Sequence, residues 1–256
     1  MTFSDLIKSF WLFILLCIFC FKLPVIFLFL IRFVIFVRWK IIDLKLAFQR
    51  KKRGETLFQP FGLKMFCGKQ GSGKTMSMVW YLDRLRKRYP RALIFTNFSY
   101  CHQTAPLENL NDLLKYRNGT DGVIFALDEI QNEFSSASSK DFPETLLSEI
   151  TMQRKQRMTI LASSQVFSRI AKPLREQCFE VMDCQTFFGR WTRIKCYDAY
   201  DYCSIIDNYN PERKFKLPKK WKRSFIQTDD LRDSYDTYEK VQRLSRQGFA
   251  AKKVTD

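Results

Sequence analysis

The sequence predicts an α/β fold with a mostly parallel β-sheet, preceded by an N-terminal membrane segment. Three observations support this prediction. Short apolar strands alternate with longer helical stretches between residues 61 and 209. A glycine-rich loop joins the first of these strands to a helix, and a separate apolar run near the N-terminus is too long for a buried strand. With 25 Phe, 10 Tyr and 5 Trp in 256 residues, the chain has enough apolar surface to exclude disorder throughout.

The net charge of +17 is concentrated at the two ends of the chain. Residues 1–60 carry 10 basic and 3 acidic side chains, and residues 210–256 carry 13 and 7, whereas the middle is nearly balanced. Basic segments of this kind attract anionic partners, either lipid headgroups or nucleic acid. We therefore expect a globular middle between two ends that meet polyanions.

Residues 10–37 form an apolar run of 28 residues whose only charged side chains are Lys22 and Arg32. A bilayer-spanning helix needs about 20 apolar residues, and the core of a cleaved signal peptide has only about 7–15. The run therefore predicts a membrane segment. Two topologies remain open: a single helix over about residues 11–31 with a kink at Pro24, or a re-entrant hairpin that turns at residues 22–24.

The flank that follows this run is basic: Arg38, Lys40, Lys45 and the run from Arg50 to Arg53. Basic residues next to a membrane segment mark the cytoplasmic side. We expect everything after residue 38 to face the cytoplasm.

A predicted strand at residues 63–67 leads into a loop and then into a predicted helix over residues 76–88. The loop consists of Gly68, Lys69, Gln70, Gly71, Ser72, Gly73, Lys74 and Thr75. This G-x-x-x-x-G-K-[ST] pattern, between a strand and a helix, is typical of a phosphate-binding loop. Its glycines let backbone N–H groups point at an anion, while Lys74 reaches the β- and γ-phosphates and the Thr75 hydroxyl ligates Mg²⁺. The sequence therefore predicts a nucleotide site.

A second strand is expected at residues 92–97, and a third at residues 122–127 ends in Asp128 and Glu129. An acid at the end of an apolar strand is suited to hold Mg²⁺ opposite a phosphate loop, which is the role expected of Asp128. Glu129 can then act as a general base on water. The pair favours hydrolysis over transfer of a phosphoryl group to a hydroxyl acceptor.

The next predicted strand, residues 159–163, ends at Ser164 and Gln165. In a parallel sheet Gln165 emerges at the same edge as the phosphate loop, where it can sense the γ-phosphate or orient water. A helix is expected over residues 144–157. Four arginines are candidates for action across a subunit interface: Arg154, Arg157, Arg169 and Arg175. Each of them can instead complement a helix C-terminus or form part of a solvated basic face.

After further strands near residues 179–188 and 193–197, the chain becomes strongly basic with interspersed aromatic residues. The candidate contacts for DNA or lipid are Arg213, Lys214, Lys216, Lys219, Lys220, Trp221, Lys222 and Arg223. Cations neutralise phosphates and aromatic rings stack on unpaired bases, which favours single-stranded DNA. An anionic membrane surface and a plain solvated tail remain the alternatives. A mixed-charge helix over residues 229–251 is expected to contact other subunits or partners.

The cysteine and histidine content narrows the chemistry. The eight cysteines are scattered and His102 is the only histidine, so the sequence predicts no zinc site and disfavours nucleophilic catalysis assisted by histidine. Cys17 and Cys20 lie inside the apolar run, where they are expected to form helix surface. We expect reduced thiols.

The order of the phosphate loop, the strand ending in Asp128 and Glu129, and the segment from Arg154 to Gln177 resembles the zonula occludens toxin (Zot)-like family. That family is similar in turn to the FtsK–HerA group of DNA-pumping P-loop ATPases. The resemblance covers about residues 60 to 205 and implies a RecA-like domain that uses ATP and Mg²⁺. Familiar members of the family are inner-membrane ATPases for filamentous-phage assembly and export, whose membrane segment follows the ATPase domain. Here the membrane segment precedes it, as in conjugative coupling proteins.

The expected organisation is a short tail at 1–9, a transmembrane or re-entrant segment at 10–37, a basic linker at 38–60, a P-loop ATPase domain at 61–209 and a basic tail at 210–256. The expected function is that of an ATPase at the host inner membrane, with its motor in the cytoplasm. It would form a homo-oligomeric ring that drives phage DNA, or works with assembly proteins, in export. The alternatives are a genome-packaging or conjugative DNA-translocating ATPase and an ATP-gated scaffold at an export pore.

Overall fold

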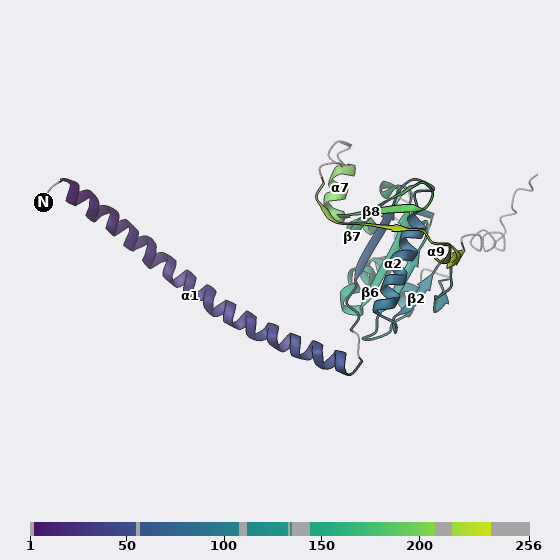
Figure 1. Cartoon of the computed structure of the whole chain (residues 1–256), viewed down its shortest axis with the longest axis horizontal. Helices are drawn as coiled ribbons and strands as arrows, with labels where there is room; N and C mark the ends of the chain where they lie inside the picture. Colours follow the sequence, from purple (N-terminus) through teal and green to yellow (C-terminus); the bar gives the residue numbers. More distant parts are fainter. Residues whose placement is uncertain are drawn as a thin grey trace, which may run out of the picture. The chain divides into compact units, whose positions relative to one another are not determined.

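The computed structural model describes residues 3–54, 57–107, 112–132, 134, 144–207 and 217–236. The chain divides into two compact units, Met1–Thr56 and Leu57–Asp256. The first unit is one helix, α1 (Phe3–Lys52), and the second is a β-sheet with helices packed on it (Figure 1).

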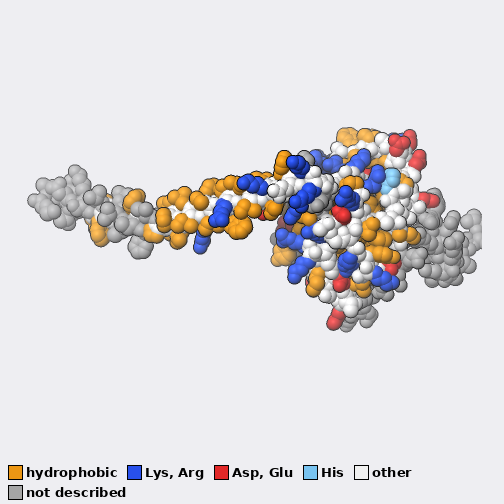
Figure 2. All heavy atoms as spheres, turned by 90° about the horizontal axis from the view of Figure 1, so that it is seen from below, with side chains coloured by type: hydrophobic (Ala, Val, Ile, Leu, Met, Phe, Trp, Pro, Cys, Tyr) orange, Lys and Arg blue, Asp and Glu red, His pale blue; other side chains and the backbone are white. Residues whose placement is uncertain are grey.

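Helix α1 runs without interruption through Pro24. Of the two topologies that the sequence leaves open, the structure shows the single helix, because residues 22–24 are helical, whereas the membrane segment itself stays a prediction. Proline removes one backbone donor, but its ring holds φ near the helical value, and the flanking residues continue the helix. The described side chains from Val25 to Phe36 are almost all large, apolar and exposed, and Figure 2 shows apolar side chains along much of the helix.

A search of the described residues finds no helix that is long and apolar enough to cross a membrane. The membrane segment predicted at residues 10–37 is therefore not confirmed. Side chains within that segment, among them those of residues 14–18 and 20–23, lie outside the described part.

The second unit is built on an eight-stranded sheet with the strand order β4-β2-β5-β6-β1-β7-β8-β9. Its strands are β1 (Gly62–Cys67), β2 (Leu93–Thr96), β4 (Ala105–Pro106), β5 (Val123–Leu127), β6 (Met158–Ser164), β7 (Cys178–Phe187), β8 (Trp191–Asp198) and β9 (Lys219–Ile226). All neighbouring pairs from β4 to β7 are parallel. Strand β8 pairs antiparallel with both β7 and β9. The predicted α/β fold with a mostly parallel sheet is confirmed. Strands β3 (Ser99–Tyr100) and β10 (Tyr235–Asp236) form a separate small sheet.

The longest helix of this unit, α2 (Lys74–Arg88), follows the glycine-rich loop and lies across one face of the sheet (Figure 1). The other elements are α3 (Asp112–Lys115), η1 (Ile130–Asn132), α4 (Glu144–Thr151), α5 (Gln153–Gln156), η3 (Phe167–Arg169), α6 (Lys172–Glu176), α7 (Ala199–Asp207) and α9 (Asp229–Asp233). The helix predicted over residues 144–157 is thus two shorter helices that break at Met152.

The sheet is covered on both faces, which explains why its central strands are mostly apolar. In β1, Leu63 and Met65 belong to the core with α4, α6 and α7, whereas Phe66 points to the opposite face. There it packs with Met78 and Leu82 of α2. The alternation of side chains along β1 therefore serves two cores, one on each side of the sheet.

The segment predicted as a basic tail is partly built into the sheet. Strand β9 pairs with β8 along its length, and its aromatic residues face α2. The ring of Phe225 stacks on that of Trp80 with centroids 4.9 Å apart. Residues 219–226 are therefore not a tail, because burying Trp221 and Phe225 against the core fixes this segment. Of the helix predicted over residues 229–251, the structure describes only α9, and residues 237–256 lie outside the described part.

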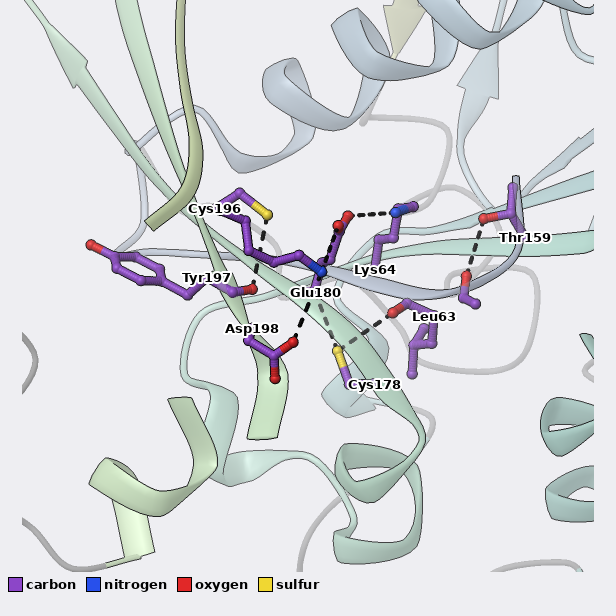
Figure 3. A network of polar contacts seen from close by, with 10 residues as sticks. Leu63, Lys64, Thr159, Cys178, Glu180, Cys196, Tyr197 and Asp198 are labelled. Atoms are coloured by element: carbon purple, nitrogen blue, oxygen red, sulfur yellow. Dashed lines mark hydrogen bonds and ion pairs between the residues drawn. The ribbon is translucent and has the colours of Figure 1, made fainter. Parts of the chain in front are cut away.

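An ion-pair network that is nearly buried at Lys64 and exposed at Lys220 joins the central strand β1 to the edge strand β9 (Figure 3). Lys64 of β1 forms an ion pair with Glu180 of β7, and both side chains are nearly buried. Lys220 of β9 lies 3.1 Å from the Glu180 carboxylate and 3.9 Å from that of Asp198. Burial acts to raise the pKa of Glu180, but the ammonium groups of Lys64 and Lys220 outweigh it and hold that pKa below its usual value.

The variant Glu180→Gln is expected to lower the free energy of unfolding at pH 7 by up to about 3 kcal/mol, because it leaves the buried ammonium of Lys64 without its counter-charge. A carboxylate with a lowered native pKa stabilises the fold above its unfolded pKa, and this contribution disappears as the pH falls through the native value. In urea unfolding, the difference in the free energy of unfolding between wild type and variant should therefore decrease below about pH 4. The matched control is Glu176→Gln, whose exposed pair with Lys172 contributes less than about 1 kcal/mol. A gap that stays constant down to pH 3 would contradict this account.

Candidate active site

The phosphate loop and the two acids meet at one edge of the sheet. Strands β1, β5 and β6 are parallel and adjacent, so Cys67, Leu127 and Ser164 end at the same edge. The residues that follow these three strands therefore converge. This brings the loop after β1 next to Asp128 after β5 and Gln165 after β6.

The loop from Gly68 to Gly73 has a backbone that favours glycine. Gly71 and Gly73 have φ values of 76° and 82°, in the left-handed region, and Gly68 has a φ of 153°. Gly73 is the N-cap of α2, so the unpaired N–H groups of the first helical turn point into the loop. The buried hydroxyl of Ser72 has no hydrogen-bond partner in the described residues. The loop thus has the form of a cradle for phosphate oxygens.

Lys74 and Thr75 begin α2 and face the acids at the end of β5. The Lys74 ammonium is buried, with the Lys69 carbonyl oxygen 3.3 Å away and the Glu129 carboxylate 4.0 Å away. A buried cation with such long contacts is well placed to accept an anion. The Thr75 hydroxyl donates to the Asp128 carboxylate at 3.1 Å.

Asp128 is held from three sides. Its backbone N–H donates to the Asn97 side-chain oxygen at 2.7 Å, and the Asn97 amide donates back to the Asp128 carbonyl oxygen at 3.1 Å. The hydroxyl of Ser163 in β6 donates to the Asp128 carboxylate. Asn97 and Ser163 were not among the predicted site residues, although each ends or follows a predicted strand at this edge.

Glu129 has a backbone φ of 54°, which is rare for a residue other than glycine. Its N–H donates to the Ser163 hydroxyl at 3.0 Å. The carboxylate accepts hydrogen bonds from the Gln131 amide and, at 3.4 Å, from the Gln165 amide. Strained backbones of this kind cluster at functional sites. The strain here turns the Glu129 carboxylate toward Lys74.

The donor set fits a magnesium ion. Mg²⁺ binds through one or two protein oxygens and completes its shell with water and substrate phosphates. Thr75 and Asp128 supply two such oxygens next to the phosphate loop. The described residues contain no cluster of three or more His, Cys, Asp or Glu side chains that could form an all-protein metal cage.

A second wall of the nucleotide pocket comes from residues that sequence reasoning missed. A cavity of about 270 Å³ beside the loop is also lined by Thr186, Gly189, Gln227 and Tyr235. The Thr186 hydroxyl donates to the Ser72 carbonyl oxygen at 3.0 Å, and Gln227 donates to Thr192 at 2.8 Å. No local motif marks these residues, because long-range pairing of β7, β8 and β9 brings them to the loop.

The candidate trans arginines lie in two places. Arg154 and Arg157 precede β6, at the sheet edge opposite the phosphate loop. The Arg154 guanidinium lies 5.5 Å from the Phe61 ring centroid, and Arg157 donates to the Thr120 carbonyl oxygen at 3.2 Å. Arg169 in η3 and Arg175 in α6 come after β6 in the sequence, and β6 ends on the side of the sheet where the phosphate loop lies. A role across subunits stays a prediction for all four.

The predicted basic contacts are divided by the fold. Lys219, Lys220, Lys222 and Arg223 lie on β9. Lys220 is engaged with Glu180, and Trp221 packs against the core beside α2, so the predicted role of these two in binding a ligand is not supported. Lys222 and Arg223 are exposed on opposite faces of the strand. Arg213, Lys214 and Lys216 lie outside the described residues.

No family model and no curated protein matches this sequence. The N-terminal domain of zonular occludens toxin from Neisseria meningitidis matches the fold with a TM-score of 0.47 and 17% identity, over 69% of this chain and 99% of that domain. The genome packaging NTPase B204 from Sulfolobus turreted icosahedral virus 2, in complex with ATP-gammaS, matches with a TM-score of 0.43 and 12% identity, over 55% of this chain and 93% of B204.

A third match is the cytoplasmic domain of the Thermomonospora curvata type VII secretion ATPase EccC, with a TM-score of 0.39 and 10% identity. It covers 55% of this chain and 23% of that one. The chain is thus structurally similar to a Zot domain and to packaging and secretion ATPases, as its sequence predicts, and the similarity concerns the fold.

The variant Gly73→Ala is expected to weaken binding of a fluorescent ATP analogue by more than ten-fold, because a Cβ at residue 73 would collide with the Thr186 hydroxyl. The matched control is Gly71→Ala. Gly71 also has a left-handed φ, but a Cβ there meets open space. Both alanines carry a backbone cost of about 1–2 kcal/mol, so the difference between them isolates the collision. Equal losses of affinity in the two variants would show that Thr186 does not limit the loop.

Proposed function

We propose that the chain is a Mg²⁺-dependent ATPase. One observation carries this proposal: Lys74, Thr75, Asp128 and Glu129 meet at the carboxyl edge of a parallel sheet. Thr75 lies within hydrogen-bond distance of Asp128, and Lys74 lies 4.0 Å from Glu129. A phosphate cradle, a buried cation, a metal-binding oxygen pair and a carboxylate beyond them are the parts that phosphoryl transfer requires.

Each side chain then has a distinct role. The backbone of the loop and Lys74 bind the β- and γ-phosphates, which separates the Lys74 ammonium from the Glu129 carboxylate. Glu129, about one quarter exposed, accepts a proton from the attacking water. Gln165 and Gln131 orient that carboxylate through their amides. Thr75 and Asp128 would hold Mg²⁺, which would supply positive charge against the phosphates.

The work that the ATPase performs is proposed to be phage assembly or export at the host inner membrane, by a homo-oligomeric ring that acts on DNA or a DNA–protein particle. The order of motifs from residue 68 to residue 177 supports this proposal. The apolar run at residues 10–37 and its basic flank support an anchor whose following domain faces the cytoplasm. The exposed apolar surface along the described part of α1 also needs a cover, which a bilayer would supply.

The variant Glu129→Gln is expected to keep ATP affinity within about three-fold of wild type and to lower the rate of ATP hydrolysis by about 10²–10⁴-fold, because an amide cannot accept the proton from water. The measurement is phosphate release by the full chain in lipid nanodiscs, alongside binding of a fluorescent ATP analogue. The control is Glu144→Gln, which removes one exposed carboxylate from α4 and should leave both quantities unchanged.

Wild-type turnover below that of Glu129→Gln, or equal to it, would contradict the assignment of Glu129. If wild type binds ATP but does not hydrolyse it under any condition, an ATP-gated scaffold replaces the motor.

Addition of DNA is expected to raise the rate of ATP hydrolysis by the full chain several-fold, because a translocating ATPase couples turnover to movement along its substrate. The measurement compares a single-stranded circle and its duplex form at equal nucleotide concentration. The duplex as the stronger activator would favour genome packaging or conjugative transfer. If neither form changes the rate, DNA is not the substrate that the ATPase moves.

A further inference from the structure

Strands β7, β8 and β9 form an antiparallel ribbon at one side of the sheet, and its two faces differ in composition. One face carries Thr186, Thr192 and Gln227, which lie beside the phosphate loop. On the same face, Trp221 and Phe225 of β9 pack beside α2. We call the other side the open face and define it by Phe187, Trp191, Arg193, Lys195 and Lys222. Helix α7 covers this side only farther along, around Val181 and Tyr197.

The open face gathers cations from neighbouring strands. Lys195 of β8 pairs directly with Lys222 of β9, and Arg193 lies two residues away on the same side. Side chains of directly paired residues have Cβ atoms about 4.5–5.5 Å apart, and residues two apart in a strand are separated by about 6.6 Å. Lys219, the first residue of β9, lies opposite Tyr197. Asp183 of β7, opposite Lys195, is the acid that accompanies them.

This arrangement opposes folding. Like charges directly opposite each other on neighbouring strands destabilise a sheet. The pKa of Lys195 shows the same crowding: partial burial lowers it first, and Arg193, Lys219 and Lys222 lower it further, against the opposing effect of Asp183. A surface that accumulates positive charge at a cost in stability is complementary to a polyanion.

Aromatic rings occupy the same end of the ribbon. The Arg193 guanidinium lies 4.8 Å from the Phe187 ring centroid and donates to the Gln185 side-chain oxygen at 2.9 Å, so it is held over the ring. Trp191 packs edge to face against Phe187 and is half exposed. The planar groups of this end are therefore held in place before any ligand arrives.

The turn between β7 and β8 exposes one more ring. Phe188 and Gly189 have φ values of 50° and 70°, and the Arg190 N–H donates to the Phe187 carbonyl oxygen at 3.2 Å. This is a type I′ turn, in which asparagine is the favoured residue before glycine. Phe188 is instead a bulky residue with a left-handed φ, and it is 95% exposed. Folding does not explain a phenylalanine at this position, whereas contact with a ligand does.

We propose that the open face of the ribbon, with Phe188 at its tip, binds single-stranded nucleic acid. Lys195, Lys222 and Arg193 neutralise phosphates, while Trp191 and Phe188 stack on unpaired bases. The proposal deepens the proposed function, because it names the strand form of the substrate and the surface that holds it. It also places that surface on the back of the nucleotide pocket, because Thr186, which contacts the loop, is followed along β7 by Phe187 of the open face.

Two other accounts of this surface fit less well. Positive charge on an edge strand prevents sheets from joining, but Arg193, Lys195 and Trp191 belong to β8, which is not an edge. Attraction to an anionic membrane needs only charge near a surface. It explains neither the Arg193 guanidinium fixed on a ring nor a strained phenylalanine at the turn.

The test measures fluorescence anisotropy of a labelled 20-nucleotide oligothymidine with the full chain in detergent micelles, at several salt concentrations and without ATP. The double variant Lys195→Gln/Lys222→Gln is expected to bind at least ten-fold more weakly at low salt. Its slope of log affinity against log salt should shrink by about 1.4, which corresponds to two phosphate contacts on a single strand. The variant removes the repulsion between Lys195 and Lys222 together with the attraction of Lys195 to Asp183, so its urea midpoint should stay close to that of wild type, which separates lost binding from lost folding.

Two further variants sharpen the result. Lys222→Gln should weaken binding, whereas Arg223→Gln, which removes the neighbouring charge on the opposite face of β9, should change affinity by less than two-fold. Phe188→Asn should raise the urea midpoint, since asparagine suits the turn, and should lower affinity by several-fold through the lost stacking.

Several outcomes would overturn the proposal. One is an unchanged affinity for oligothymidine in the double variant and in Phe188→Asn. Another is an equal loss of this affinity in Lys222→Gln and Arg223→Gln. Tighter binding of a 20-base-pair duplex than of oligothymidine would also overturn it. So would variants that lose only cosedimentation with phosphatidylserine vesicles, since the face would then be a membrane contact. Because binding is measured without ATP, failure here leaves the Glu129-dependent hydrolysis of the proposed function intact, and failure of hydrolysis leaves this binding intact.

Discussion

The active edge of this protein depends on one constraint, the parallel alignment of β1, β5 and β6. Parallel strands end at the same edge, so three segments far apart in the sequence deliver their polar residues to one place. The alignment holds because both faces of the sheet are buried, one under α2 and the other under α4, α6 and α7. The Thr75 hydroxyl therefore lies within hydrogen-bond distance of the Asp128 carboxylate, although the two residues are 53 positions apart in the sequence. The chemistry at the edge follows from packing in the middle of the sheet.

Sequence reasoning located the parts of the site that carry local patterns. The glycines, Lys74 and Thr75 of the loop from residue 68 to residue 75 have a characteristic spacing. A strand that ends in an acid or an amide can be recognised from its own sequence. The second wall of the pocket was not readable, because Thr186 and Gln227 reach the loop only after β7, β8 and β9 pair in register. The sequence of β9 was misleading for a physical reason: Trp221 and Phe225 alternate with cations, and rings beside cations suit base stacking as well as a half-buried strand. Only the packing of β9 against distant parts of the chain decides between these two roles, and the local sequence does not indicate that packing.

Of the three described residues other than glycine that have a positive φ, Glu129 and Phe188 lie where we infer that ligands act, and the third, Arg157, ends helix α5. Glu129 and Phe188 both have left-handed φ values that ordinary side chains avoid. At Glu129 the strain is held by a hydrogen bond to Ser163, and it directs a carboxylate toward the phosphate loop. At Phe188 it holds an aromatic ring in solvent at the tip of the ribbon. Both residues lie close to the same pocket, since Gly189, next to Phe188, lines it. A shift of the β7–β8 turn would therefore be felt on both sides of the ribbon.

The outermost strands of the sheet, β4 and β9, differ in sequence, and both disfavour pairing with a further strand. Strand β4 has only two residues, and Pro106 lacks a backbone donor. Strand β9 is longer but carries lysine or arginine at four of its eight positions. Short, proline-containing or highly charged edges resist addition of another strand. In the part of the chain that the structure describes, both edge strands therefore disfavour extension of the sheet into a second copy, and side-chain contacts are the expected link between the subunits of a ring. Such contacts can slide or tilt between nucleotide states without breaking a ladder of backbone hydrogen bonds.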